Sequence, residues 1–299
     1  MRKGGSRTAV HVALFRALES ARPADRLFVD PYASRFLTPG YRAVAWAARL
    51  PPVGRRLERY IDSRWSGGPR GSAVVRTRLI DDWMTAAGAQ QALVLGAGFD
   101  SRAHRLPALR DAAVFEVDHP ATQAVKRRRL PGRVVFVPVD FLRDDLGAAL
   151  VGAGFDSGAR TVVVWEGVTN YLTESAVDAT LRSVVGLVPV GSQIVFTYVD
   201  RGVLGGGGGL AGGAGVGGVD EFGGFAGVES WRGAVSAAGE PWTFGFVPAE
   251  LPGYLADRRL RLIDDLSTRD AAALYGREEP TAAFYRVVRA EVVSGAQGH

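Results

Sequence analysis

The sequence contains no cysteine among its 299 residues. This absence excludes disulfide bonds and thiolate metal sites, and it is typical of a cytoplasmic protein. No apolar run approaches the ~20 residues that are needed to span a bilayer. We therefore expect a soluble, cytoplasmic protein that has no membrane partner.

Lysine is nearly absent, because only Lys3 and Lys126 accompany the many arginines. The formal net charge is +5, but the basic residues are spread along the chain instead of forming one stripe. A nucleic-acid surface normally gathers its positive charge on one face or one helix. We expect a small-molecule partner and no nucleic acid. The sequence does not indicate the oligomeric state.

Residues 1–75 predict a helical cap. Short helices are expected at Val10–Leu18 and Ala43–Leu50, and no alternating strand pattern appears. The basic start is followed by His11, Arg16 and Glu19, which favour an amphipathic helix over a signal peptide. Proline and glycine interrupt the pattern at residues 38–40, 51–52 and 67–69.

Residues 76–299 predict the core. A helix is expected over Arg76–Ala87, and then short apolar strands alternate with helices. The strands are expected at Ala92–Leu95, Ala113–Val117, Val134–Val137, Thr161–Trp165 and Gln193–Tyr198. Continuously apolar strands between helices indicate a parallel sheet that is covered on both faces.

The end of the chain follows a different pattern. A helix over Pro248–Arg258 precedes strands at Leu260–Leu266 and Ala283–Val293, and no long helix separates these two strands. They are therefore expected to pair antiparallel at the sheet edge. We predict an α/β fold with a Rossmann-like, mostly parallel sheet, an antiparallel C-terminal hairpin and a helical N-terminal cap. A dehydrogenase-type sheet more often ends in another parallel unit.

Residues 202–227 are rich in glycine and include the run Gly205–Gly209. Such a composition buries too little apolar surface to offset the entropy of ordering. We expect a flexible loop or lid over the carboxyl edge of the sheet, and the alternative is a tolerated insertion that has no role.

The strand that ends at Leu95 runs into the turn Gly96-Ala97-Gly98. Glycine lets the backbone approach a ligand closely, and the following helix offers free N–H groups. The pattern is weak alone, because Ser101 stands where a dinucleotide-binding turn has its third glycine.

Two acidic positions follow at later strand ends. Asp118 suits the hydroxyl groups of a ribose, in NAD as in S-adenosylmethionine (SAM), and the alternative is a cap on the next helix. Asp140 and Phe141 suit the amine and the ring of an adenine, and the alternative for Asp140 is again a helix N-cap.

Glu166 ends the fourth strand, where a carboxylate suits the ammonium of a methionine moiety. The alternative is a carboxylate that faces solvent. An arginine on the preceding helix, Arg76 or its rival Arg78, suits the methionine carboxylate because a guanidinium binds carboxylates with two parallel hydrogen bonds.

These motifs together resemble the leucine carboxyl methyltransferase family, and in particular its bacterial branch, which includes enzymes of natural-product synthesis. The resemblance rests on Arg76–Asp82, Leu95–Arg102, Phe115–Pro120, Val139–Phe141 and Glu166–Leu172, and it extends to Leu27–Ala33 and Phe284–Val287. It implies a SAM-dependent methyltransferase that forms S-adenosylhomocysteine (SAH) and needs no metal.

The resemblance implies a cofactor-binding set that combines the motifs above. The residues are Arg76, Gly96, Ala97, Gly98, Asp118, Asp140, Phe141 and Glu166. Asp140-Phe141 replaces the Asp-Leu of the family pattern and keeps an apolar contact for adenine.

The acceptor is less well defined by the sequence. Candidate substrate contacts are Tyr32, Tyr60, Arg64 and Tyr171. We expect O-methylation of a carboxyl or hydroxyl group in secondary metabolism, with C- or N-methylation, for example of an indole or amine, as the alternative. An NAD(P)-dependent oxidoreductase and a protein that only senses SAM are more remote alternatives.

Overall fold

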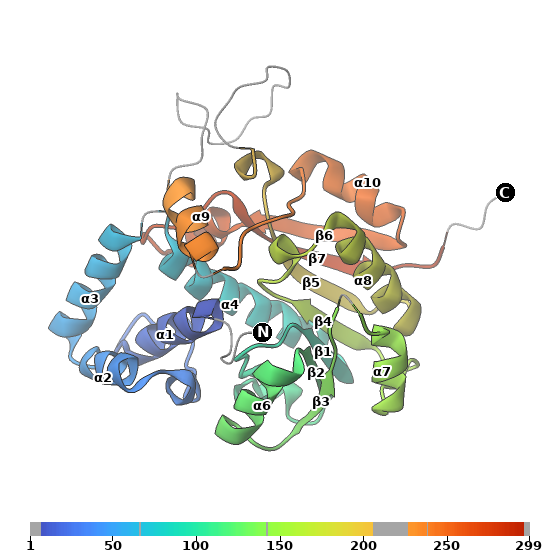
Figure 1. Cartoon of the computed structure of the whole chain (residues 1–299), viewed down its shortest axis with the longest axis horizontal. Coiled ribbons are helices and arrows are strands. Elements are labelled where there is room, and N and C mark those ends of the chain that lie inside the picture. The colour runs from blue at the N-terminus through green and yellow to red at the C-terminus, as the bar shows by residue number, and fades with distance from the viewer. Residues whose placement is uncertain (1–6, 66, 142, 206–226, 238, 296–299) are drawn as a thin grey trace.

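The computed structural model describes residues 7–65, 67–141, 143–205, 227–237 and 239–295. Seven strands form one sheet in the order β3-β2-β1-β4-β5-β7-β6 (Figure 1). The strands are β1 (Gln91–Leu95), β2 (Ala113–Asp118), β3 (Val134–Pro138), β4 (Thr161–Trp165), β5 (Gln193–Val199), β6 (Leu260–Ser267) and β7 (Tyr285–Val292). The first five pair parallel, and β7 pairs antiparallel with both β5 and β6. The predicted sheet and its antiparallel C-terminal hairpin are therefore confirmed.

The two faces of the sheet are covered by separate hydrophobic clusters. Along β4, Val163 and Trp165 contribute to one cluster, whereas Val162 and Val164 contribute to the other. This follows from the two-residue period of a strand, which points successive side chains to opposite faces. The first cluster packs under α8 (Glu174–Leu187), α7 (Leu146–Gly152) and α10 (Leu251–Ala256), and the second under α4 (Pro69–Ala87) and α11 (Thr268–Leu274).

Helix α4 begins earlier than predicted. It starts at Pro69 instead of Arg76, so it runs through the expected boundary between cap and core at residue 75. Gly68 precedes the helix with a φ of 66°. Proline is well suited to the first turn, because a backbone N–H at that position would have no hydrogen-bond partner within the helix. Pro69, which interrupted the sequence pattern, therefore begins a helix.

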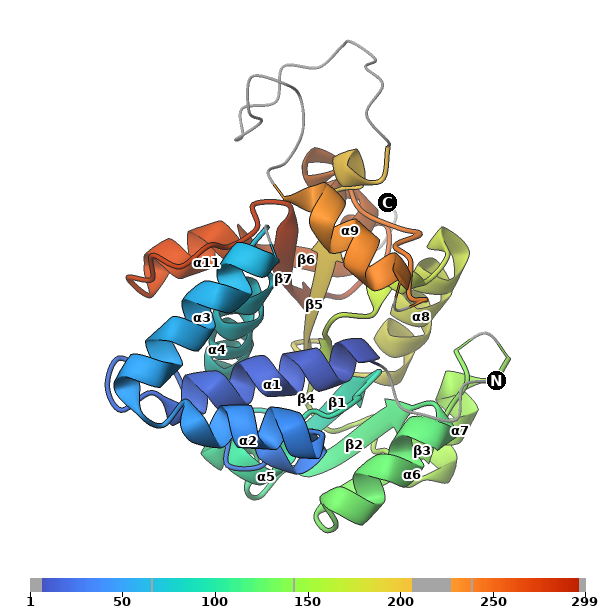
Figure 2. The same cartoon turned by 60° about the vertical axis from the view of Figure 1, so that its left-hand side comes forward.

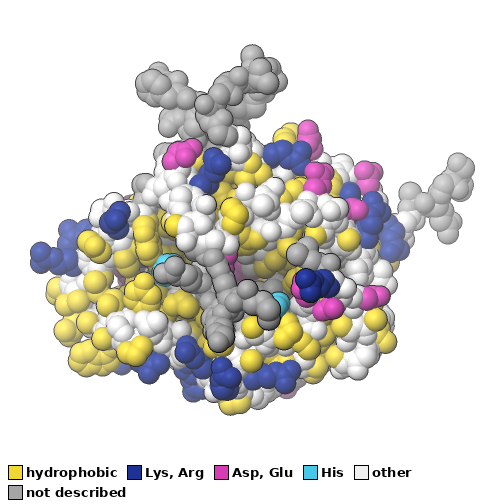
Figure 3. Space-filling model, in the orientation of Figure 1, with side chains coloured by type: hydrophobic (Ala, Val, Ile, Leu, Met, Phe, Trp, Pro, Cys, Tyr) yellow, Lys and Arg dark blue, Asp and Glu magenta, His cyan; other side chains and the backbone are white. Residues whose placement is uncertain are grey.

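The cap consists of α1 (Arg7–Ala21), α2 (Pro39–Ala47) and α3 (Pro51–Arg64) (Figure 2). The predicted helices at Val10–Leu18 and Ala43–Leu50 correspond to α1 and α2, although α2 ends at Ala47 and a third helix follows it. Exposed apolar side chains gather on the cap (Figure 3), among them Trp46 at 68% exposure.

Asp30 fixes the cap to the core. Its Oδ1 accepts hydrogen bonds of 3.0 Å from the backbone N–H groups of Tyr32 and Ala33, which begin the 3-10 helix η1 (Ala33–Phe36). Its Oδ2 accepts a 2.7 Å bond from the Ser101 hydroxyl, beyond the glycine turn of β1. Arg16 Nε on α1 lies 3.4 Å from the same oxygen. One buried carboxylate therefore joins α1, η1 and the segment that follows β1.

The remaining helices are shorter. They are α5 (Arg102–Arg105), α6 (Pro120–Arg129) and α9 (Val228–Ala237), with 3-10 helices η2 (Pro107–Leu109), η3 (Thr169–Tyr171), η4 (Arg201–Val203) and η5 (Pro248–Glu250). The helix predicted over Pro248–Arg258 is divided between η5 and α10, and α11 was not predicted. Most of the glycine-rich segment, residues 206–226, lies outside the described residues. None of the described helices is long and apolar enough to cross a membrane.

A buried ion pair holds α6 against the sheet. Lys126 Nζ lies 2.6 Å from Glu116 Oε2, and both side chains are 1% exposed. Burial raises the pKa of Glu116 to about 7, against the lowering effect of the Lys126 ammonium. Because Glu116 precedes Asp118 on β2, this pair also fixes the strand end that carries Asp118.

Replacement of Lys126 by methionine should destabilise the protein by about 3–5 kcal/mol, because it leaves a buried carboxylate without its partner. Denaturant unfolding of the wild type, Lys126→Met and the double variant Glu116→Met/Lys126→Met measures this loss. The double variant should recover most of the stability, since it removes both charges. Wild-type stability in Lys126→Met would contradict the assignment.

Candidate active site

A cavity of about 500 Å³ opens at the carboxyl ends of β1, β2 and β4, where α1 and α9 cover the sheet edge. Ligands in open α/β sheets bind outside this edge, and the volume is within the range of small-molecule sites. Every predicted cofactor residue lines this cavity: Arg76, Gly96, Ala97, Gly98, Asp118, Asp140, Phe141 and Glu166.

The turn after β1 needs glycine for two reasons. Gly96 and Gly98 have φ values of 61° and 47°, in the left-handed region that glycine adopts without strain. A Cβ atom on Gly96 would also lie 2.4 Å from Val168 Cγ2, which is far inside van der Waals contact. The backbone at Gly96 therefore packs directly against Val168, and no side chain could be accommodated there.

Asp118 is held at the end of β2 by two backbone N–H groups. Its Oδ2 accepts from Gly98, and its Oδ1 accepts from His119 at 2.6 Å. Burial raises the pKa of Asp118, and these two hydrogen bonds partly offset that effect. The helix-cap alternative is wrong, because His119 caps α6 by accepting from the Ala121 N–H at 3.2 Å.

Asp140 and Phe141 line the cavity just beyond β3. The N-cap alternative for Asp140 is also wrong, because the next helix is α7. It begins at Leu146, and Asp145 caps it by accepting from the Ala148 N–H at 3.0 Å.

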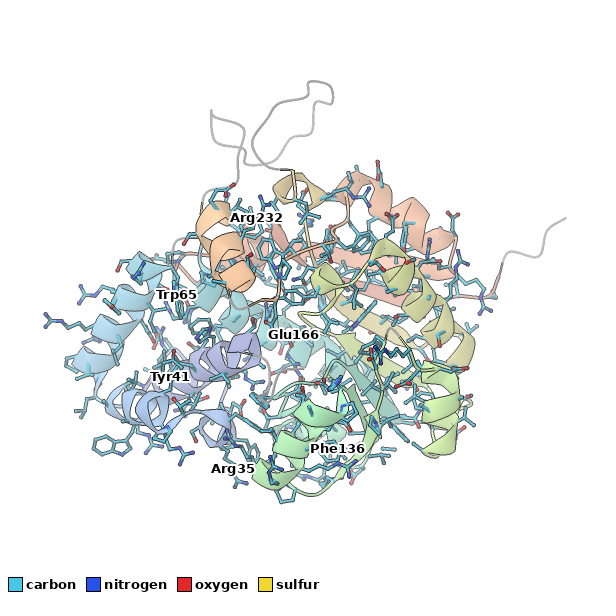
Figure 4. All side chains as sticks on the ribbon, in the orientation of Figure 1. Arg35, Tyr41, Trp65, Phe136, Glu166 and Arg232 are labelled. Carbon is cyan, nitrogen blue, oxygen red and sulfur yellow. The ribbon has the colours of Figure 1, made fainter. Side chains whose placement is uncertain are left out.

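Glu166 is the centre of a buried charge network, between the cap and the sheet (Figure 4). Arg76 Nε donates to its Oε1 and Arg102 Nη1 donates to its Oε2, each at 2.8 Å. The side chain is 13% exposed, so the alternative of a solvent-facing carboxylate is wrong. Burial would raise the pKa of Glu166, but the guanidinium groups of Arg102 and Arg76 lower it to about 2.

Arg102 was not predicted as a site residue, although it lies within a motif of the family resemblance. Its Nε donates to Asp81 at 2.7 Å, and its Nη1 donates to both Asp100 and Glu166. Its side chain is 1% exposed. Burial disfavours its charged form, but these carboxylates more than compensate and raise its pKa well above the usual range. The signal for it was an arginine four residues after Gly98, the last glycine of the turn.

The structure distinguishes the two candidate arginines of α4. Arg76 lines the cavity and is buried. Arg78 projects from another side of the helix, where its Nε donates to Asp82 at 2.9 Å and its Nη1 donates to the Leu27 carbonyl. Arg78 is therefore the wrong candidate.

Comparison with known proteins agrees with this geometry. The sequence family described as Leucine carboxyl methyltransferase matches residues 9–185. A Frankia alni protein is 35% identical over 94% of both chains, and a Streptomyces avermitilis protein is 32% identical over 90% of this chain and 87% of its own. Both relatives are provisionally named S-adenosyl-L-methionine-dependent methyltransferases.

The chain belongs to the leucine carboxyl methyltransferase family. It is a SAM-dependent methyltransferase, so the oxidoreductase and SAM-sensing alternatives are wrong. The fold has a counterpart in a crystal structure from Thermobifida fusca, provisionally described as a methyltransferase. That structure has a TM-score of 0.56, is 17% identical, and covers 93% of this chain and 97% of its own.

Within this methyltransferase, only one of the four predicted substrate contacts lines the cavity. Tyr171 does so, from η3. Tyr60 and Arg64 lie four residues apart on α3, hence on one side of it, and both are exposed. Tyr32 packs against His104, with ring centroids 5.7 Å apart. The structure thus places Tyr32, Tyr60 and Arg64 away from the cavity.

The part of the cavity beyond the cofactor residues was not predicted. It is formed by α1, the end of α3, α9 and the segment after it, and the start of β7. These elements contribute aromatic rings from Phe15, Trp65, Trp231, Trp242 and Tyr285. No spacing rule joins them, because they meet only in the folded chain.

Replacement of Glu166 by glutamine should lower the free energy of unfolding by about 3 kcal/mol at neutral pH. This loss follows from the pKa of Glu166, which is lowered from 4.5 to about 2 in the folded protein. A lowered carboxyl pKa stabilises the folded state above pH 4.5, and that contribution is lost as the pH falls toward 2. The difference between wild type and Glu166→Gln should therefore shrink over this window in urea unfolding. Glu250→Gln, at an exposed site, is the control. A difference that does not change with pH would contradict the network.

Proposed function

We propose that this methyltransferase transfers the methyl group of SAM to an oxygen of a carboxyl or hydroxyl group on a small molecule of secondary metabolism. The observation that carries the SAM site is the convergence of Asp118, Asp140 and Glu166 on one cavity beside the glycine turn. The oxygen acceptor follows the matched family, which is described as methylating a carboxyl group. These residues come from three different strand ends, so their meeting at one place is a property of the fold.

The residues that line the cavity fit SAM along its whole length. We assign to Asp118 the hydrogen bonds from the ribose hydroxyl groups, and to Phe141 and Asp140 the contacts with the adenine, because all three line the cavity at strand ends. Glu166 supplies a carboxylate for the ammonium of the methionine moiety, and Arg76 retains guanidinium donors for its carboxylate. The turn Gly96-Ala97-Gly98 lines the cavity, and its glycines let a ligand approach the backbone closely.

SAM supplies an activated methyl group on a sulfonium, which is a good leaving group. The protein mainly has to align the acceptor with that methyl group and exclude water. A carboxylate acceptor is ionised at neutral pH and needs no base, whereas a hydroxyl acceptor has a proton to lose. Cap helix α1 covers the cavity, which suits the exclusion of water.

The division of labour within the chain belongs to the same proposal. The cap is assigned to residues 1–75 and the SAM-binding core to residues 76–299, with α4 as the continuous helix that joins them. Thr8, His11 and Val12 on α1 line the cavity opposite the strand ends, so the cap closes a site that the core alone would leave open.

Replacement of Asp118 by alanine should weaken SAH binding at least about tenfold, because a hydrogen bond to a charged group contributes roughly 1.5–3 kcal/mol. Calorimetry with SAH and with NAD measures this effect. Asp111→Ala, at an exposed site before β2, is the matched control and should bind SAH normally. Tight NAD binding without SAH binding would refute the proposed cofactor site.

Replacement of Phe141 by alanine should weaken SAH binding by roughly 1–3 kcal/mol if its ring stacks on the adenine, as aromatic side chains do on nucleic-acid bases. The same calorimetric titration measures this loss. Phe141→Leu restores the apolar contact of the family pattern and should recover part of the affinity. Unchanged SAH affinity in Phe141→Ala would show that the ring only fills the core.

A further inference from the structure

The part of the cavity that lies beyond the proposed SAM site is walled by large aromatic rings that are only half buried. Trp65, Trp231 and Trp242 are all of this kind. Trp65 ends α3 on the cap side (Figure 4), whereas Trp231 lies on α9 and Trp242 lies after it. Such rings contribute binding energy mainly by packing against another flat apolar surface. The walls therefore suit a flat ligand.

Three rings, those of Tyr285, Trp231 and Trp242, form a continuous series that begins at the proposed SAM site. The Arg76 guanidinium carbon lies 4.9 Å from the ring centroid of Tyr285. The ring of Trp231 stacks on the ring of Tyr285, with centroids 5.5 Å apart and an interplanar angle of 2°. Trp242 follows at 5.8 Å from Trp231. A ligand held against this series lies next to the amino-acid end of the proposed cofactor site, because Arg76 also binds Glu166.

The arginines that line the cavity within the described chain are Arg16 and Arg76, and each already has a carboxylate partner. Arg16 pairs with Asp30 and donates to the Phe99 carbonyl at 2.6 Å. Arg76 pairs with Glu166, and its other donors are assigned to the cofactor. A carboxylate acceptor that bound here would lose its hydration without gaining a guanidinium partner. The burial of such an unpaired charge costs free energy.

The aromatic part of the cavity instead presents a carboxylate. Glu240 lines it and accepts a hydrogen bond from the Thr8 hydroxyl of α1. A carboxylate has about four acceptor positions, so one hydroxyl leaves capacity for another donor. Nearby, burial raises the pKa of Tyr171 to about 12, which keeps its phenol neutral. His11 lies against Trp65, with ring centroids 5.1 Å apart.

We propose that the methyl acceptor is a flat aromatic molecule whose hydroxyl or amine group donates a hydrogen bond to Glu240, and that it is not a carboxylate. This inference rests on the proposed function. It keeps the hydroxyl acceptor, excludes the carboxyl acceptor, and admits the amine of the alternative function. The aromatic walls bind the ring of the acceptor, and Glu240 selects the polar group. A negatively charged group in the same place would be repelled by Glu240.

The test is calorimetry on protein saturated with SAH, with three indoles that differ in one group: tryptamine, tryptophol and indole-3-acetate. SAH binding is measured first, so failure of the cofactor site is recognised separately. Tryptamine and tryptophol should bind at least about tenfold more tightly than indole-3-acetate, because their side-chain groups can donate to Glu240, whereas the carboxylate of indole-3-acetate has no proton to donate and is repelled by it. Binding of none at millimolar concentration, or tightest binding of indole-3-acetate, would overturn the proposal.

Two variants identify the residues responsible. Glu240→Gln should weaken tryptamine binding about tenfold and leave SAH binding unchanged, whereas Trp231→Ala should weaken binding of all three indoles. Glu229→Gln, on the exposed side of α9, is the matched control and should change neither. Unchanged tryptamine affinity in Glu240→Gln would overturn the role of this carboxylate, and a loss of SAH binding in Trp231→Ala would assign the aromatic wall to the cofactor.

Discussion

The site depends on a carboxylate that is held between two guanidinium groups. Glu166 is buried at the end of β4, where a lone negative charge would be expensive. Arg76 comes from α4 and Arg102 from the segment after β1, so the compensation of this charge requires both elements to be in place. The ion pairs of Glu166 with Arg76 and Arg102 therefore fix the positions of these three side chains without a bound ligand.

This network also extends away from the cavity. Arg102 and Arg105 both donate to Asp81, one turn and a half along α4 from Arg76. Mutually compensating charges of this kind resist rearrangement, because loss of any one leaves a partner buried and unpaired. Pre-organisation suits methyl transfer, whose barrier is lowered mainly by alignment of the two reactants.

The cofactor side of the molecule could be predicted from the sequence for a physical reason. A parallel sheet places the carboxyl ends of its strands at one edge, so residues such as Asp118 and Glu166 meet whenever the strands are identified correctly. The strands themselves are apolar and rich in valine, which identifies them. Local rules failed where proline began a helix instead of ending one, as at Pro69. At Asp118 and Asp140, the alternative of a helix cap is excluded because His119 and Asp145 are the caps.

The acceptor side could not be predicted, because its residues are joined by tertiary contacts between elements that have no fixed spacing. Trp231 and Tyr285 are 54 positions apart, yet their rings stack with an interplanar angle of 2°. Tyr60 and Arg64 were chosen for their residue types, but the turn of α3 directs them to solvent. The Thr8 hydroxyl on α1 and Glu240, two residues that line the cavity, are 232 positions apart and yet share a hydrogen bond. In the proposed assignment, the specificity for the acceptor therefore depends on how the cap and α9 close on the sheet, whereas the use of SAM is encoded in the strand ends.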